Sequence, residues 1–428
     1  MFSGARIRVY PTEEQEREML RIAGCCRLVY NLGLAQRRDF WRQMKRGVGH
    51  GPTWFSQKRE LTALRAEHEF LRDCPVHCLQ SALRDLDAAF VNFWEGRADY
   101  PTPRKRDRHV SFRFPDPAQI RLEVKESRLV LPKFGKTKRD HGALRAVFHR
   151  PLRGRVRSVT IVREGAKWFA SVLMRTRAEP PVLTAPITPE DVVGVDRNIA
   201  APAVTSEGEL LGHRITTPAE KRKRRRLAKA VSRTRRGSRR SEKAKGRLRA
   251  FDAKRKRRRQ DMTHQITAHL AKNHRVIVIE KLDVRAMTAS ARGTAAEPGR
   301  NVAQKSGLNR SILDVAWGEI RRQLLYKLQR AGGVLIEVSA RDTSRTCGDC
   351  RVVDAASRVS RDRFVCVRCG HAAHADVNAA IEIRRRGLIA LGLTPAGTVG
   401  EARGAPIAIG VDGAVNREEE NDGIRSAA

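Results

Sequence analysis

The stretch Val192-Val193-Gly194-Val195-Asp196 consists of four apolar residues that end on a carboxylate. A second stretch further along the chain, Val276-Ile277-Val278-Ile279-Glu280, has the same form. Short apolar runs rich in β-branched residues are typical of strands that are buried on both faces. Each stretch therefore predicts a central strand of a sheet that ends at an acidic side chain.

A third carboxylate, Asp376, opens the helical stretch Asp376-Val377-Asn378-Ala379-Ala380-Ile381. Two strand ends and a helix start can bring carboxylates together although they lie far apart in the sequence. We predict that Asp196, Glu280 and Asp376 hold two Mg²⁺ ions, spaced about 3.5–4 Å apart, that cut phosphodiesters. An aspartate that ends a strand is more often only a turn former, so this prediction depends on the order of the surrounding elements. Asn378 could support the site by hydrogen bonding or only cap the helix.

The order of the predicted helices and strands in the second part of the chain is typical of an RNase H-like fold, in which the first and fourth strands lie side by side. A three-strand meander comes first, followed by a long basic helical stretch, a fourth strand, a mobile loop, a helix, a fifth strand and a final helix. The expected ranges are 191–196, 200–206, 209–215, 218–272, 275–280, 284–307, 309–331, 334–339 and 375–386.

The first part of the chain predicts a small β-barrel with a helical segment inserted into it. Residues 5–11 alternate as in a strand, and Thr12 with Gln15 forms a capping box that opens a helical region up to about residue 96. From about residue 108 apolar and polar residues alternate again, as in strands, and a hairpin is expected around Gly165. The buried helical stripe is expected at Leu79, Leu83, Leu86, Phe90 and Phe93.

Composition points to a polyanionic partner. Lysine and arginine total 86 against 47 acidic residues, a net charge of +39, which is far more than solubility needs. Because aromatic residues make up only 5% of the chain, binding should depend on phosphate contacts more than on stacking. No apolar run approaches the roughly 20 residues of a spanning helix, so no membrane partner is expected. We expect a cytoplasmic, nucleoid-associated prokaryotic protein.

The basic charge is densest between Lys221 and Arg259. Charge runs are often only solvated faces or localisation signals, but apolar residues within this one keep it attached to a core as helix. Nucleic-acid contact is the favoured interpretation. The predicted contact residues are Arg222, Lys223, Arg225, Arg226, Arg235, Arg236, Arg239, Arg240, Arg255, Arg257 and Arg258.

Four cysteines have the spacing of a zinc ribbon. Cys347-x2-Cys350 and Cys366-x2-Cys369 are separated by fifteen residues, and each pair can place two thiolates on one tight turn. Four thiolates leave no open coordination position, so the predicted Zn²⁺ is structural. The other cysteines, at 25, 26, 74 and 78, lie within apolar helical patterns and are expected to pack in a core.

These motifs together resemble the TnpB (OrfB) family of transposon-encoded RNA-guided DNA endonucleases, which are related to the compact type V CRISPR nucleases. The resemblance covers the chain to about residue 386 and is most specific in Thr343-Ser344-Arg345-Thr346-Cys347 and in residues 369–380. Other matching motifs are Arg8-Val9-Tyr10-Pro11-Thr12, Gly194-Val195-Asp196 and Val278-Ile279-Glu280-Lys281-Leu282.

The resemblance implies a multidomain α/β architecture. A wedge-type β-barrel (1–11 and 97–180) would carry a helical recognition lobe (12–96). A RuvC nuclease domain (191–342 and 371–387) would be interrupted by a zinc ribbon (343–370), and residues 388–428 would be a mostly disordered tail.

The resemblance also implies the activity. Asp196, Glu280 and Asp376 would be the RuvC triad that binds Mg²⁺. A guide RNA from the transposon end would pair with double-stranded target DNA beside a short motif that the protein reads. The single nuclease site would then cut both strands.

Two positions depart from the family pattern. Asn198 and Arg351 stand where the family commonly has glycine. Asn tolerates a positive φ better than most residues, so the turn after Asp196 should survive, whereas Arg351 puts the turn of the first cysteine pair in question. Neither position supplies a metal ligand.

Two other functions compete with the nuclease interpretation. A cleavage-silent, guided DNA-binding repressor would be expected to have lost a triad carboxylate, and this chain keeps all three. An accessory transposase could use the same acids, but nothing in the sequence suggests a transposon-end-binding domain or a nucleophilic tyrosine. The sequence therefore favours the enzyme.

Overall fold

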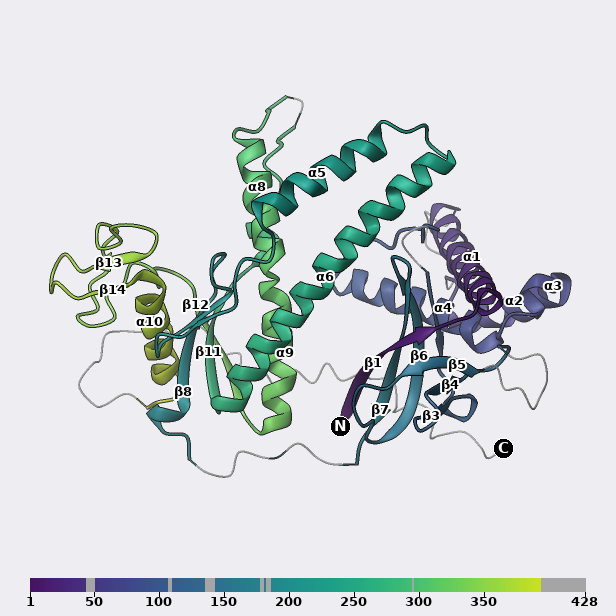
Figure 1. Ribbon diagram of the computed structural model, residues 1–428, viewed down its shortest axis with the longest axis horizontal. Coiled ribbons are helices and arrows are strands. Elements are labelled where there is room, and N and C mark those ends of the chain that lie inside the picture. The colour runs from purple at the N-terminus through teal and green to yellow at the C-terminus, as the bar shows by residue number, and fades with distance from the viewer. Residues whose placement is uncertain are drawn as a thin grey trace. The chain divides into compact units, whose positions relative to one another are not determined.

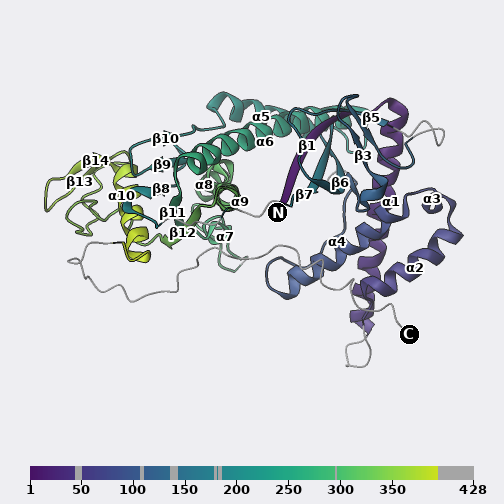
Figure 2. The ribbon, with the colours of Figure 1, turned by 90° about the horizontal axis from the view of Figure 1, so that it is seen from below.

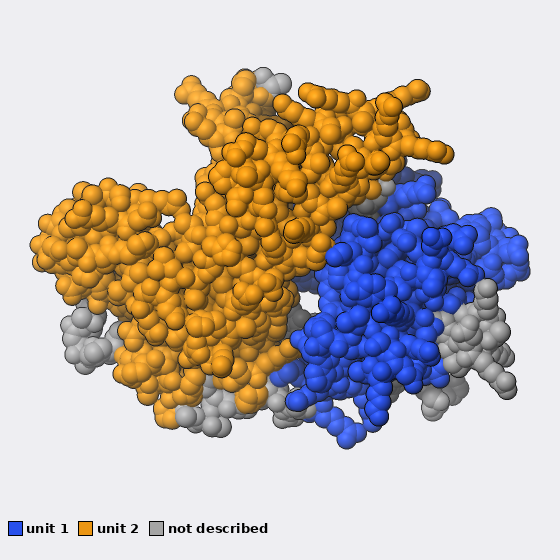
Figure 3. Space-filling view, viewed as in Figure 1, with its two compact units in different colours: residues 1–179 blue, residues 180–428 orange. Residues whose placement is uncertain are grey.

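The computed structural model describes residues 1–43, 51–106, 110–134, 143–177, 181, 186–294 and 296–393 (Figure 1). The chain divides into two units, residues 1–179 and 180–428 (Figure 3). Among the described residues, no helix is long and apolar enough to cross a membrane.

Unit 1 is built on an antiparallel sheet of seven strands in the order β2-β6-β7-β1-β5-β4-β3. Every second residue of β1 is buried, as the alternation of Ala5, Ile7 and Val9 predicts. The hairpin of β6 and β7 turns at Gly165, whose φ of 62° is in the left-handed region. The strands are β1 (Phe2–Tyr10), β2 (Ser111–Phe114), β3 (Arg121–Glu123), β4 (Arg128–Val130), β5 (Ala143–Val147), β6 (Arg155–Glu164) and β7 (Lys167–Arg175). The outer strands β2 and β3 do not pair with each other in the part that the structure describes, so a closed barrel stays a prediction.

Among the described residues, four helices lie between β1 and β2 in the chain, as the helical patterns predict. They are α1 (Glu13–Gln43), α2 (Trp54–Glu67), α3 (Glu69–Arg72) and α4 (Val76–Trp94), and Figure 2 shows α4 crossing beside α1. The predicted stripe of α4 is buried at Leu79, Leu83, Leu86 and Phe90, but Phe93 is only partly buried. All four cysteines of this unit are buried, which confirms that they are core residues.

Unit 2 contains the predicted RNase H-like sheet, in the order β10-β9-β8-β11-β12. The first strand of the sheet pairs in parallel with the fourth, with Val276 opposite Val192 and Ile279 opposite Val195. The strands are β8 (Val192–Asp196), β9 (Ala203–Thr205), β10 (Leu210–Leu211), β11 (Val276–Lys281) and β12 (Val334–Ser339). The second and third strands are thus shorter than the predicted 200–206 and 209–215.

Both faces of this sheet are covered, which is why its central strands are continuous apolar runs. Ile277 and Ile279 of β11 pack into the core that includes α6 (Arg239–Asn273) and α9 (Trp317–Ala331). Val276 and Val278 pack on the opposite side with Ile383 of α10 (Ala375–Ala390). Figure 1 shows α10 on one side of the sheet and α6 and α9 on the other.

Three predictions for the middle of unit 2 are wrong in detail. The basic stretch is two helices, α5 (Pro218–Ser232) and α6, because the chain turns at Gly237 with a φ of 85°. The expected mobile loop 284–307 instead contains α7 (Val284–Met287) and the start of α8 (Val302–Val315). The helix expected over 309–331 is interrupted at Ala316, whose φ is 62°, so that it forms two helices, α8 and α9.

The tail prediction is also wrong at its start. Helix α10 continues to Ala390, past the predicted end at 386, because Leu388, Leu391 and Leu393 pack against the sheet core. The remainder of the predicted tail, residues 394–428, lies outside the described residues. Before α10, the short strands β13 (Arg363–Val365) and β14 (Ala372–His374) form a hairpin that extends past residue 370.

Candidate active site

The ends of β8 and β11 place two of the predicted carboxylates side by side. Val195 pairs with Ile279, so the next residue on each parallel strand, Asp196 or Glu280, emerges at the same end of the sheet. The sequence prediction that the first and fourth strands bring these residues to one edge is therefore confirmed.

Gly194 explains how the third carboxylate approaches. A Cβ atom at this position would lie 2.1 Å from the backbone oxygen of Ala380 and 2.5 Å from the backbone nitrogen of Arg384. Only glycine allows α10 to approach β8 so closely. The N-terminal turn of that helix carries Asp376, which is buried.

Asp196 is electrostatically coupled to both other acids. Burial, together with the negative charges of Glu280 and Asp376, raises the pKa of Asp196 to about 8, against the opposing charge of Arg358. Burial also raises the pKa of Glu280, although a hydrogen bond from Thr343 opposes the shift. The three acids therefore form a buried site that favours a bound cation or a proton.

Four neighbouring side chains hold this site in place. Thr343 Oγ1 donates to Glu280 Oε1 at 2.5 Å, and Arg197 donates to the backbone oxygen of Glu280. Asn198 Nδ2 donates to Asp376 Oδ2. A guanidinium nitrogen of Arg358 lies 3.4 Å from the other carboxylate oxygen, Oδ1. Sequence reasoning missed these contacts, because none of the four residues has a spacing that ties it to a carboxylate.

Asn198 also departs from its predicted conformation. It is absent from the non-glycine residues with positive φ, so the turn after Asp196 does not use the left-handed region. Its side-chain oxygen accepts a hydrogen bond from the backbone nitrogen of Ala200 at 3.1 Å, a local turn that Asn forms readily. The same side chain thereby shapes the turn and contacts Asp376.

The distances between the carboxylate oxygens decide whether all three acids can bind the same ion. Two oxygens on one Mg²⁺ lie at most about 4.2 Å apart, since each bond is about 2.1 Å. The three triad carboxylates do not all approach within 4.8 Å of one another; in the part that the structure describes, one group of acids and histidine that does so is Asp362, His374 and Asp376. A single ion that all three carboxylates bind therefore does not fit these distances.

The four predicted zinc cysteines do come together. Cys347 Sγ lies 3.7 Å from Cys369 Sγ, Cys350 Sγ lies 3.4 Å from Cys366 Sγ, and all four sulfur atoms are within 4.8 Å of one another. A tetrahedron with Zn–S bonds of about 2.3 Å has sulfur atoms about 3.8 Å apart. The donor set and its spacing thus fit Zn²⁺.

The two cysteine turns have matching backbone geometry. The backbone nitrogens of Asp349 and Arg368 each donate to the first cysteine sulfur of their own pair at 3.4 Å. The residue after each pair has a positive φ, 69° at Arg351 and 72° at Gly370. The turn that lacks glycine thus keeps its shape, with a non-glycine residue in the left-handed region.

Asn378 connects the cysteine module to the helix that carries Asp376. Its side-chain oxygen accepts from the backbone nitrogen of Gly348, and its side-chain nitrogen donates to the backbone oxygen of Thr346, each at 2.8 Å. The side chain is fully buried. Asn378 is therefore no helix cap; the capping side chain is His374, whose Nδ1 accepts from the backbone nitrogen of Asp376.

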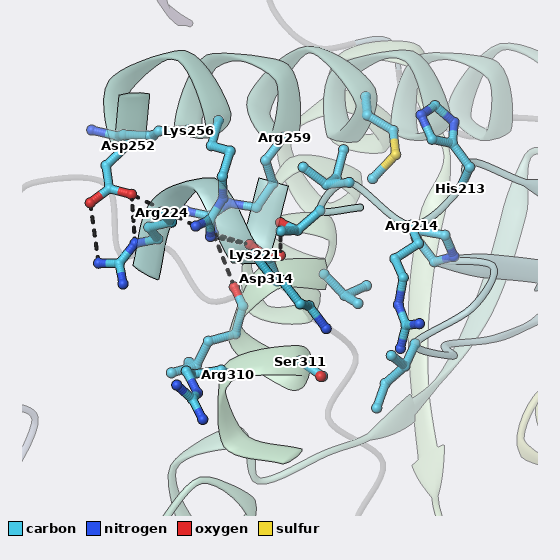
Figure 4. A pocket seen from close by; sticks show the side chains of 18 of the residues that line it. His213, Arg214, Lys221, Arg224, Asp252, Lys256, Arg259, Arg310, Ser311 and Asp314 are labelled. Atoms are coloured by element: carbon cyan, nitrogen blue, oxygen red, sulfur yellow. Dashed lines mark hydrogen bonds and ion pairs between the residues drawn. The ribbon is translucent and has the colours of Figure 1, made fainter. Parts of the chain in front are cut away.

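The predicted nucleic-acid contacts fall into two groups. Arg225 of α5 and Arg255 of α6 line a cavity of about 740 Å³ (Figure 4). The other predicted residues lie outside that cavity: Arg222, Lys223, Arg226, Arg235, Arg236, Arg239, Arg240, Arg257 and Arg258. Arg258 pairs with Glu220 at 2.7 Å.

Three family models match the chain. A "Helix-turn-helix domain" of the OrfB_IS605 group matches residues 1–46, "Probable transposase" matches 171–291, and "Cas12f1-like, TNB domain" matches 317–383. Residues 1–43 fold as β1 followed by the single helix α1. The third model covers the cysteine module and most of α10.

Curated relatives resemble the chain over almost its whole length. It is 34% identical over 384 residues to "Putative RNA-guided DNA endonuclease InsQ" of Escherichia coli, covering 89% of this chain and 91% of the relative. It is 32% identical over 395 residues to "Putative RNA-guided DNA endonuclease" of Streptomyces pristinaespiralis, covering 90% and 89%. Among solved structures, a Cas12f1–sgRNA–target DNA complex matches with a TM-score of 0.53 at 11% identity, over 90% of this chain and 98% of that chain, which shows similarity of fold.

Proposed function

Because this chain belongs to the TnpB (OrfB) family of RNA-guided DNA endonucleases, we propose that it cuts target DNA at a RuvC-type site that binds two Mg²⁺ ions. The observation that carries the proposal is the convergence of three carboxylates: Asp196 and Glu280 leave the same end of the paired strands β8 and β11, and α10, packed on β8 at Gly194, carries Asp376. Such a cluster of acidic side chains would hold divalent ions.

Each side chain of the site has a separate task in the proposal. Asp196, Glu280 and Asp376 would hold the ions, which supply an activated water and neutralise the leaving oxygen when bound. Thr343 orients Glu280 through its hydrogen bond, while Asn198 and Arg358 fix the two carboxylate oxygens of Asp376. Because burial beside two other acids raises the pKa of Asp196, ion binding should release a proton from this carboxyl wherever the pH lies near or below that pKa.

The partners follow from the family and from the charge. A guide RNA from the transposon end would select a double-stranded target beside a short motif, and one nuclease site would cut both strands. The net charge of +39 supports a polyanionic partner of this size. Zn²⁺ at the four cysteines would be structural, holding the segment that leads to Asp376. The proposal locates the protein in the prokaryotic cytoplasm, at the nucleoid.

The test begins with the RNA that copurifies with the expressed protein and its flanking transposon end. Sequencing that RNA identifies the guide segment, and a labelled duplex is then made that matches it and is flanked by randomised bases. We expect cleavage of this duplex with Mg²⁺ and none with a chelator. A duplex with a scrambled match is the control, and selection among the flanking bases reveals the adjacent motif.

Two results would change the proposal. Guide-matched binding without any cutting by the unmutated protein would favour the cleavage-silent repressor. Cutting that persists in Asp196→Ala or Glu280→Ala would show that the chemistry occurs at another site.

A further inference from the structure

A strongly basic cavity of about 740 Å³ lies in unit 2 among α5, α6, α8 and the segment after β10 (Figure 4). Eight Lys or Arg residues line it against two acids, Asp252 and Asp314. The lining thus carries a surplus of six positive charges around a single hollow. Such a surplus in a concave site concentrates anions.

The two acids hold arginines in fixed positions. Asp252 accepts two hydrogen bonds from Arg224, at 2.8 and 3.2 Å. Asp314 accepts from Arg255 at 2.8 Å and from Thr216, and Arg259 lies 3.6 Å away. One carboxylate, 18% exposed, therefore orients two guanidinium groups from successive turns of α6.

Three further cations of the lining lie outside the ion pairs of the described residues. In the part of the chain that the structure describes, Lys221 and Arg225 of α5 and Arg310 of α8 form no ion pair, and all three are exposed. Among the described residues that line the cavity there is no Phe, Tyr or Trp, although the imidazole of His213 is part of the lining. The lining therefore suits phosphate groups better than the stacking of several bases.

Part of the cavity wall belongs to the segment that follows Asp196 in the chain. Ile199 and Pro202 form part of its wall, and both belong to the segment between β8, which ends at Asp196, and β9. A strand held in the cavity would pass close to the loop that begins at that carboxylate.

We propose that this cavity is a clamp for the phosphodiester backbone of a nucleic acid, and that Asp314 is a positioning residue that presents Arg255 and Arg259 to it. The inference deepens the proposed function, because a guided nuclease must hold a strand beside its site. The clamp is tested by measuring binding and not cleavage, so the clamp and the proposed nuclease function can fail separately.

The main experiment compares two triple variants of the RNA-free full-length protein. The cavity variant is Lys221→Gln, Arg225→Gln, Arg310→Gln. The control, Lys229→Gln, Lys243→Gln, Arg247→Gln, removes the same charge from exposed positions of α5 and α6 outside the cavity. Fluorescence anisotropy at several NaCl concentrations measures binding of a labelled mixed-sequence single-stranded RNA and of a labelled duplex DNA.

The cavity variant should bind on the order of tenfold more weakly, and the slope of log K against log salt should fall by roughly 2–3, since each phosphate contact contributes about 0.7–0.9. The control should change the slope by less than about 1. If the cavity variant loses affinity for the RNA probe alone, the clamp binds RNA; if it loses affinity for the duplex alone, the clamp binds DNA. A loss of affinity for both probes means that the clamp accepts either backbone. Equal losses in both variants, or none in either, would overturn the proposal.

The variant Asp314→Asn distinguishes an effect of arginine positioning from an effect of the net charge of the cavity. The substitution makes the cavity more positive, so a simple charge effect predicts tighter binding. The clamp predicts weaker binding, because Arg255 and Arg259 lose the carboxylate that orients them. If the Asp314→Asn protein has the same unfolding temperature as the wild type and yet binds the probes more tightly, Asp314 does not position the two arginines.

Discussion

The cysteine cluster and the carboxylate triad are two candidate metal sites of one unit, and they differ in how closely their side chains approach one another. The four sulfur atoms already lie at distances that suit a zinc tetrahedron, whereas the triad oxygens do not all come within 4.8 Å. Neutral thiols can pack together without an ion. Buried carboxylates repel one another, and the raised pKa of Asp196 expresses that repulsion together with its burial.

The two sites therefore depend on the fold to different degrees. The cysteine module is closed by its own two turns, so a local sequence pattern describes it almost completely. The triad depends on three separate elements, and Gly194, Asn198 and Thr343 decide how those elements meet. We therefore expect changes at the triad to affect chemistry and changes at the cysteines to affect stability.

The largest effect should follow from Asp196→Ala. Loss of this carboxylate should reduce cleavage of the guide-matched duplex by at least about 10³-fold, the equivalent of several kcal/mol of transition-state stabilisation. Zinc content should not change. Asp261→Ala, at an exposed acid of α6, is the control and should cut at the wild-type rate. Normal cleavage by the Asp196 variant would remove the triad from the mechanism.

Cys366→Ser should act on the other site. We expect the variant to lose close to one zinc per chain and to unfold at a markedly lower temperature, because structural Zn²⁺ contributes about 10–16 kcal/mol of binding free energy to a folded module. Metal analysis and calorimetry provide the measurements. Cys74→Ser, in the core of unit 1, should retain the zinc. Unchanged metal content in the Cys366 variant would rule out the zinc ribbon.

Asn378→Ala tests the connection between the sites. It leaves the backbone groups of Thr346 and Gly348 without their buried partners, which should lower the free energy of unfolding by about 2–4 kcal/mol. Zinc should stay bound while cleavage falls, since the segment that leads to Asp376 is no longer tied to the cysteine turn. Asn273→Ala, at an exposed position, is the control. Full activity with the expected loss of stability would show that the two sites work independently.

The stability of the metal-free protein should depend on the charge of Asp196. Its folded-state pKa of about 8 lies above the ordinary value of 3.8, so its stabilising contribution is complete below about pH 4 and is lost as the pH rises through 8. Thermal unfolding in a chelator that spares zinc should show this decline. Asp196→Asn should reduce it and unfold a few degrees higher near pH 8. Identical pH profiles for both proteins would mean that Asp196 is not buried beside like charges.

The smallest effect concerns the two cysteine turns. Arg351→Gly should stabilise the zinc-bound protein by about 1 kcal/mol, because it relieves a non-glycine residue of a positive φ. Gly370→Ala, at the matching position of the second turn, should destabilise by a similar amount. Calorimetry at saturating zinc measures both. A destabilised Arg351→Gly protein would indicate that the contact of Arg351 with the Gly348 backbone outweighs the strain.

Residue patterns predicted those parts of the structure that depend on local chemistry. The apolar runs before Asp196 and Glu280 and the cysteine spacing predicted the sheet order and the cysteine cluster. The long basic periodicity obscured the turn at Gly237, although a glycine followed by Ser238, the N-cap of α6, is a signal of a helix boundary. Ala316 is itself a good helix former, so its left-handed conformation leaves no such signal. The basic cavity depends on how three helices are rotated against one another, and no single stretch of sequence records that rotation.

The most direct test of the two-ion site is a count of the Mn²⁺ ions that Mg²⁺ displaces from RNA-free protein, measured by electron paramagnetic resonance for the wild type and Asp196→Asn. We expect two such ions in the wild type and a loss of both high-affinity ions in the variant, with zinc retained in each. Equal Mn²⁺ binding by the two proteins would contradict a metal site centred on Asp196.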